Sequence, residues 1–117
     1  MRRVIVVDDE PTVLALVRDI LVSSGYTVTT VPSGTEALRR LEIDTFDLVI
    51  TDLRMPEMSG RELIAQLRAQ PAYKKVPILV LATGAEEAEL DTLKVDMRIG
   101  KPFPPKMLVT AVRALIG

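Results

Sequence analysis

Short apolar runs alternate with longer amphipathic stretches along the whole of this 117-residue chain. Four of the runs, at 4–7, 27–31, 48–50 and 78–81, are rich in β-branched residues, and a fifth, at 95–99, alternates apolar with charged residues. A continuous apolar run is typical of a strand that is covered on both faces of a sheet. The run at 27–31 is the most polar of the first four, so we expect it near an edge.

The stretches between the runs carry apolar residues at helical spacing. Their starts carry a proline in the first turn or a Ser-x-x-Glu capping pattern. These signals are Pro11, Ser33 with Glu36, Ser59 with Glu62, and Pro104 with Pro105. The stretch 85–94 is the weakest helix, because it is short, acidic and poorly amphipathic. Five strands alternating with five helices predict an α/β fold, a doubly wound five-stranded parallel sheet with helices on both faces.

One domain over residues 1–117 is expected, because this length is near the common domain size and no linker or repeat interrupts the chain. Histidine and cysteine are absent, which excludes a thiol nucleophile, a disulfide framework and a histidine base or metal ligand. The net charge of −1 offers no global field for nucleic acid or an anionic membrane. No run approaches the roughly 20 apolar residues of a membrane span, so we expect a cytoplasmic protein.

Polar side chains follow four of the predicted strands at their carboxyl ends. They are Asp8, Asp9 and Glu10 after the first strand, Asp52 after the third, Thr83 after the fourth and Lys101 after the fifth. In doubly wound sheets ligands bind at this edge. Two carboxylates about 4 Å apart repel by about 4 kcal/mol at an effective dielectric near 20. One lysine cannot cancel three such charges, whereas a hard divalent cation such as Mg²⁺ can. A cation, a lysine and a hydroxyl around a nucleophilic carboxylate suit phosphoryl transfer.

These residues and their neighbours resemble the receiver domain of bacterial response regulators. The matching segments are VVDDEP at 6–11, DLRMP at 52–56 with Gly60, Thr83, and KPF at 101–103. The resemblance covers essentially the whole chain, in the right order, and implies the flavodoxin-like strand order 2-1-3-4-5. It implies a phosphorylation-dependent switch of two-component (phosphorelay) signal transduction, whose phosphoryl donor is a sensor histidine kinase, a phosphotransfer protein or a small phosphodonor. Such a chain catalyses its own phosphorylation and dephosphorylation without turning over a separate substrate.

The resemblance also implies the ligands of the Mg²⁺ cofactor. Asp9 would bind the ion directly and Asp8 largely through water. Asp52 and the backbone carbonyl of Arg54 would complete the protein ligands.

For the phosphoryl group, the resemblance implies that Asp52 is the acceptor, held as an aspartyl phosphate. Thr83 would donate a hydrogen bond to a phosphoryl oxygen and Lys101 would pair with the group. The Lys101–Pro102 bond is expected to be cis, which would aim the lysine into the pocket.

Three departures from the family pattern fall on the output side of the domain. The segment between Thr83 and Lys101 is short, which predicts a shortened fourth helix, and Lys94-Val95-Asp96 replaces the usual Gly-Ala pair. Arg98 stands three residues before the lysine, where the family usually carries its aromatic switch residue. We therefore expect ordinary phosphotransfer with an unusual readout, in which Arg98 swings towards acids such as Glu89 or Asp91.

Other functions stay open at this stage. A degenerate receiver would be a phosphorylation-independent protein-binding module, which the altered fourth helix favours and the complete acidic pocket opposes. A Mg²⁺-dependent phosphohydrolase commonly has a second acid two residues after its aspartate, where Arg54 stands. A flavin or nucleotide binder lacks its Gly-rich loop here. Each site residue alone also has a plainer reading as a cap, turn or surface residue.

The expected partners are the kinase or phosphotransfer protein and a downstream effector or output domain that the sequence does not identify. No nucleic acid and no membrane are expected to bind this chain itself, and a weak homodimer stays open. The sequence does not decide between a stand-alone receiver and a fragment of a longer regulator.

Overall fold

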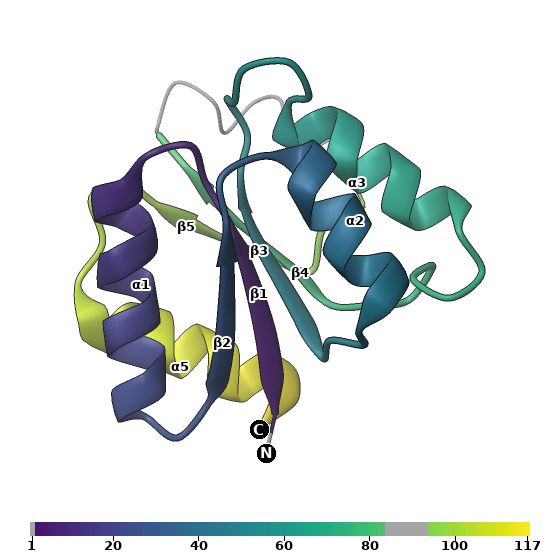
Figure 1. The fold of residues 1–117 in the computed structure, drawn as a ribbon. Helices are drawn as coiled ribbons and strands as arrows, with labels where there is room; N and C mark the ends of the chain where they lie inside the picture. The colour runs from purple at the N-terminus through teal and green to yellow at the C-terminus, as the bar shows by residue number, and fades with distance from the viewer. Residues whose placement is uncertain (1, 84–93) are drawn as a thin grey trace.

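The computed structural model describes residues 2–83 and 94–117, and within them the chain forms one parallel five-stranded sheet of order β2-β1-β3-β4-β5 (Figure 1). The strands are β1 (Arg3–Val7), β2 (Thr27–Val31), β3 (Leu48–Asp52), β4 (Ile78–Ala82) and β5 (Met97–Gly100). The helices of the described part are α1 (Pro11–Ser23), α2 (Gly34–Ile43), α3 (Gly60–Ala69) and α5 (Pro105–Ile116). The predicted fold class, parallel pairing and strand order are confirmed.

The expected fourth helix and its shortening fall on 85–94, and residues 84–93 lie outside the described part of the chain. The same holds for Glu89 and Asp91, the proposed partners of Arg98. The expectations about them stay predictions.

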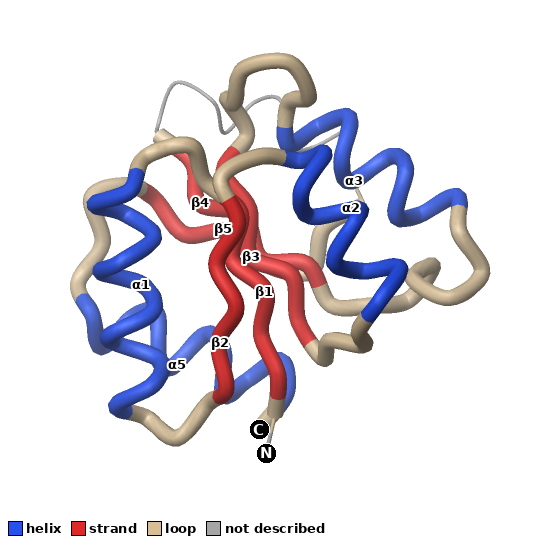
Figure 2. The backbone as a smooth tube through the Cα atoms, in the orientation of Figure 1, coloured by secondary structure: helices blue, strands red, loops and turns tan. Residues whose placement is uncertain are grey.

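The helices of the described part cover both faces of the sheet, with α1 and α5 on one side and α2 and α3 on the other (Figures 1 and 2). The side chains of β1 alternate between the two cores. Ile5 and Val7 pack in the core under α2 and α3, and Val4 and Val6 pack in the core under α1 and α5. All four are buried, which explains why this strand reads as a continuous apolar run.

The helix starts follow the predicted signals with one difference. α3 begins with a complete capping box between Ser59 and Glu62. At α2 the Ser33 hydroxyl accepts the Glu36 N–H at 3.2 Å, while the Glu36 carboxylate pairs with Arg39 at 3.2 Å. That ion pair uses the side chain that would otherwise complete the second box.

β5 begins later than the strand expected over 95–99. Before the strand, Asp96 makes two hydrogen bonds with Ile78. Its N–H donates to the Ile78 carbonyl at 3.0 Å, and its carboxylate accepts the Ile78 N–H at 2.8 Å. The regular ladder starts only after this pair. Val95 packs against the core under α2 and α3, whereas Met97 and Ile99 lie against the opposite core, so the expected alternation holds from Met97 onwards and is wrong at Val95.

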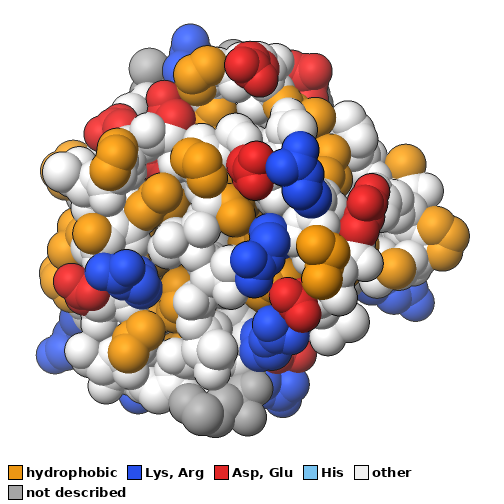
Figure 3. All heavy atoms as spheres, in the orientation of Figure 1, with side chains coloured by type: hydrophobic (Ala, Val, Ile, Leu, Met, Phe, Trp, Pro, Cys, Tyr) orange, Lys and Arg blue, Asp and Glu red, His pale blue; other side chains and the backbone are white. Residues whose placement is uncertain are grey.

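The surface carries both signs of charge side by side on the face shown in Figure 3. This mixture agrees with the nearly balanced count of 15 basic and 16 acidic residues. Among the described residues, no helix has the length and apolar character that crossing a membrane requires.

Candidate functional site

Three charged side chains meet at the carboxyl ends of β1, β3 and β5. Asp8 is fully buried and Asp52 is 6% exposed. The Lys101 ammonium nitrogen lies 3.3 Å from Asp8 Oδ2 and 3.5 Å from Asp52 Oδ1. One ammonium group thus bridges two buried carboxylates that neighbouring strands carry, as the strand-end pattern predicts.

Backbone amides hold the two carboxylates in place. Asp8 Oδ1 accepts the Glu10 N–H at 3.0 Å, and Asp52 Oδ1 accepts the Leu53 N–H at 2.8 Å. Each of these hydrogen bonds is local, so the turn that follows each strand sets the rotation of its carboxylate. The two acids are therefore oriented before any ligand arrives.

Lys101 directly follows β5, and its N–H donates to the Ala82 carbonyl at 2.8 Å, which extends the β4–β5 ladder to the rim of the site. The Lys101–Pro102 bond is cis, as the resemblance implied. Burial lowers the pKa of Lys101, but the negative charges of Asp52 and Asp8 and their hydrogen bonds outweigh it and hold the pKa above its ordinary value. The side chain is therefore a cation at neutral pH.

Position 60 requires a glycine because the backbone at the end of β3 lies very close to it. A Cβ added there would lie 1.9 Å from the Asp52 carbonyl oxygen. The Gly60 N–H also donates to the Leu53 carbonyl at 2.9 Å. The start of α3 therefore lies directly against the end of β3 and fixes the loop that presents Asp52.

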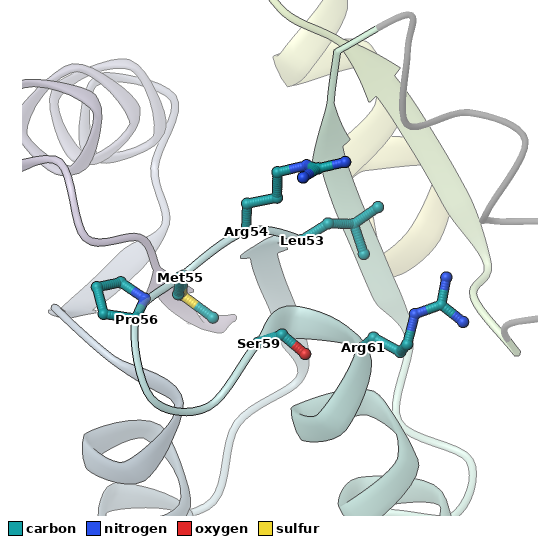
Figure 4. A pocket seen from close by; sticks show the side chains of 6 residues that line it. All are labelled: Leu53, Arg54, Met55, Pro56, Ser59 and Arg61. Atoms are coloured by element: carbon teal, nitrogen blue, oxygen red, sulfur yellow. The ribbon is translucent and has the colours of Figure 1, made fainter.

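Arg54 lies in the loop between β3 and α3, and its side chain is exposed. It lines an open hollow together with Leu53, Met55, Pro56, Ser59 and Arg61 (Figure 4). The predicted metal ligand of Arg54 is its backbone carbonyl, which belongs to this same loop.

Asp9 and Glu10 extend the acidic cluster towards solvent. Carboxylate oxygens of Asp8, Asp9 and Glu10 lie within 4.8 Å of one another. Asp52 is not among the residues of this group, and it is joined to Asp8 through Lys101. No role was predicted for Glu10, although its place in the same acidic triplet is the sequence signal that points to it.

Thr83 follows β4 directly and is exposed. It lines a mostly apolar hollow together with Val13, Leu16, Lys101, Pro102 and Phe103. Thr83 and Lys101 therefore border one depression at the carboxyl edge of the sheet. The apolar lining from α1 and from the loop before α5 was not part of the sequence expectation.

The donor set fits a hard divalent cation. The available ligand atoms are oxygens only, which suits Mg²⁺. Two carboxylates of low exposure, Asp8 and Asp52, contact the ammonium group of Lys101, so negative charge is concentrated at this end of the sheet. Asp9 is exposed at the mouth, where water can complete an octahedral shell.

Comparison with known proteins gives one consistent result. A family model described as the response regulator receiver domain matches residues 4–113. The alkaline phosphatase synthesis transcriptional regulatory protein PhoP of Bacillus subtilis is 35% identical over 98% of this chain, which spans 48% of that protein. The chemotaxis protein CheY1 of Helicobacter pylori is 34% identical over 98% of this chain and 97% of its own length. The solved structure of the Thermotoga maritima response regulator TrrA in complex with Mg(2+)-BeF has a TM-score of 0.90 and 33% identity, covering 98% of this chain and 99% of its own.

Proposed function

The chain belongs to the response regulator receiver domain family, and from this premise we propose that it is a signalling switch that accepts a phosphoryl group on Asp52. The observation that carries the proposal is the contact of one ammonium group, on Lys101, with the buried carboxylates of Asp8 and Asp52. This arrangement orients a carboxylate nucleophile beside a fixed positive charge. A positioned carboxylate and a fixed positive charge are two of the requirements of phosphoryl transfer to a carboxylate.

In the proposed step a carboxylate oxygen of Asp52 attacks the phosphorus atom of the donor. The new O–P bond forms as the bond between phosphorus and the leaving group breaks, and the leaving group keeps that electron pair. The Leu53 N–H fixes the attacking carboxylate. Lys101 pairs with the negative phosphoryl oxygens, and Thr83 donates a hydrogen bond to one of them.

We propose that Asp8, Asp9, Asp52 and the backbone carbonyl of Arg54 hold Mg²⁺. When bound, the ion neutralises negative charge on the phosphoryl oxygens. Support comes from the oxygen-only cluster and from the TrrA structure, which is a complex with Mg(2+)-BeF. Asp8 contributes a buried, prepositioned carboxylate, and Asp9 contributes one that is open to water.

The proposed phosphoryl donor is a sensor histidine kinase or a phosphotransfer protein, and the proposed receiver of the signal is an effector protein or an output domain. The relatives support both kinds of output, because one is a transcriptional regulator and another is a chemotaxis protein. We further propose that the readout differs from an aromatic switch, because Arg98 stands at that position on β5. The cytoplasmic location stays a prediction.

Intact-mass spectrometry tests the proposal. The chain and its Asp52→Ala variant are incubated with acetyl phosphate, with and without Mg²⁺, and sampled at short times. We expect the chain to gain one phosphoryl group only when Mg²⁺ is present, and the variant to gain none. A chain that gains no group at any sampling time would contradict the proposal and favour a phosphorylation-independent binding module.

A further inference from the structure

Arg68, in the last turn of α3, makes five hydrogen bonds with one guanidinium group and is only 15% exposed. The acceptors are the carbonyl oxygens of Tyr73 (3.3 Å), Lys74 (3.1 Å), Val76 (2.7 Å) and Lys94 (3.0 Å), and Oδ2 of Asp96 (3.1 Å). This side chain therefore ties the end of α3 to the loop before β4 and to the segment before β5. None of these contacts belongs to the candidate functional site.

The carboxylate that Arg68 holds also sets the pairing of the last two strands. Asp96 Oδ2 accepts the Ile78 N–H at 2.8 Å, and the Asp96 N–H donates to the Ile78 carbonyl at 3.0 Å. Both backbone groups of Ile78, the first residue of β4, are thus bound by one residue. The β4–β5 ladder continues directly from this pair, with Leu79 opposite Met97.

β5 has few other features that specify its register, namely the Lys101 N–H that donates to the Ala82 carbonyl and the partly buried Met97 beside Ile99. Within the described residues it is an edge strand of four residues that pairs with β4 alone, and Ile99 is its single buried residue. A strand whose apolar pattern is this short specifies its register weakly. A slip by two residues would keep Ile99 on the same face but would displace the chain by about 6.6 Å. The Lys101 ammonium group would then leave its positions 3.3 and 3.5 Å from the two carboxylates.

We propose that Arg68 is a positioning residue for Lys101. Through Asp96 it fixes the register of β5, and the register places the ammonium group between Asp8 and Asp52. The inference rests on the proposed function, in which Lys101 pairs with the phosphoryl group. Arg68 acts from the amino end of the strands and touches no reacting group. Its planar fork of five N–H donors serves carbonyl and carboxylate acceptors together, which a lysine cannot do.

The first test compares Arg68→Gln with Arg39→Gln, a matched control on α2 whose guanidinium group pairs with Glu36 at the surface. The Mg²⁺-dependent rate constant for phosphorylation by acetyl phosphate should fall about tenfold in Arg68→Gln, because a displaced catalytic group loses its alignment. The control should keep the rate of the parent chain. In ¹H–¹⁵N NMR spectra the amide signals of Gly100 and Lys101 should move in Arg68→Gln, while those of β1 and β2 should not.

A second arm separates positioning from general loss of structure. Arg68→Gln is combined with Lys101→Ala, and the rate is compared with that of Lys101→Ala alone. If Arg68 acts through Lys101, the second change has no further effect on the rate. A further fall in rate as large as the one that Arg68→Gln causes in the parent chain would show a purely structural role and overturn the inference.

Should Arg68→Gln fail to fold, Asp96→Asn replaces it, because the amide oxygen can still accept the Ile78 N–H while the ion pair is lost. In Asp96→Asn the phosphorylation rate should again fall and the amide signals of Gly100 and Lys101 should again move, each by less than in Arg68→Gln. A parental rate together with unmoved Gly100 and Lys101 signals would overturn the inference and leave the proposed function standing. A parent chain that takes no phosphoryl group would contradict the proposed function, and the amide signals would still decide whether Arg68 fixes the register.

Discussion

Lys101 provides the positive charge that lets two carboxylates of low exposure, Asp8 and Asp52, lie at one end of the sheet. The ammonium group is partly open to solvent, since its side chain is 18% exposed. The Asp8 side chain is fully buried and that of Asp52 is 9% exposed, so their repulsion is only partly screened by water. A bound cation or a mutation of Lys101 therefore changes the net charge around these two carboxylates most directly.

Lys101→Met should destabilise the metal-free chain by about 2 kcal/mol, because it leaves the two carboxylates without their shared cation. The same change should tighten Mg²⁺ binding, since the ion no longer competes with an ammonium group. Urea unfolding with and without Mg²⁺ measures both effects. The gain in unfolding free energy on adding Mg²⁺ should be larger in the variant than in the parent chain. An equal gain would show that Lys101 and the ion do not share these carboxylates.

Gly60→Ala should disturb the site through the backbone. The added Cβ would lie 1.9 Å from the Asp52 carbonyl oxygen and 2.8 Å from Leu53 Cα, so the strand end or the helix start must move. We expect a loss of roughly 2 kcal/mol or more in unfolding free energy and slower phosphorylation. Gly100→Ala is the matched control, because the nearest described atom to its Cβ would be the Ala82 carbonyl oxygen, at 3.9 Å. Equal urea midpoints for the two variants would refute the close-approach explanation.

At the scale of elements, Tyr73 joins the loop before β4 to the end of α2. Its hydroxyl donates to the Leu41 carbonyl oxygen and lies 3.1 Å from the Asp44 carbonyl oxygen. Burial, and then the charge of Asp44, raise the pKa of Tyr73 above its ordinary value. The folded chain therefore favours the neutral phenol.

Tyr73→Phe should cost about 1 kcal/mol at neutral pH, because the carbonyl oxygens lose their donor. The contribution of the raised pKa is fully present below the unfolded value near 10 and is lost as pH rises through the folded value. Stability of the parent chain should therefore fall more steeply above about pH 10 than that of the variant. Urea unfolding at pH 8 and at high pH measures the difference. A gap between the two chains that stays constant with pH would contradict this role of the phenol.

The elements themselves were largely predictable from local pattern. β2 spans the expected run 27–31, and the signals at Pro11 and Ser59 mark the starts of their helices. The start of β5 was not predictable, because the Asp96–Ile78 pair that delays it depends on a contact 18 residues away. The partner of a side chain was equally unpredictable where two partners compete. Glu36, for example, pairs with Arg39, whereas the sequence pattern predicted a capping box with Ser33.

At the scale of the whole molecule, the site follows from the strand order. β1 and β3 are neighbours in the middle of the sheet, so the acids that follow them lie side by side at the carboxyl edge. The sequence indicated this convergence, because parallel strands share one carboxyl edge. It could not indicate that Asp8 is fully buried or that Lys101 contacts both acids, since these depend on the register of strands far apart in the chain.

The most direct test of the central proposal is to locate the phosphoryl group within the chain. The chain is phosphorylated with acetyl phosphate and Mg²⁺, reduced with borohydride to convert an aspartyl phosphate into homoserine, digested, and analysed by peptide mass spectrometry. We predict homoserine at position 52 alone. Conversion at Asp8 or Asp9 instead, or no conversion anywhere in a chain shown to be folded, would contradict the assignment of Asp52 as the phosphoacceptor.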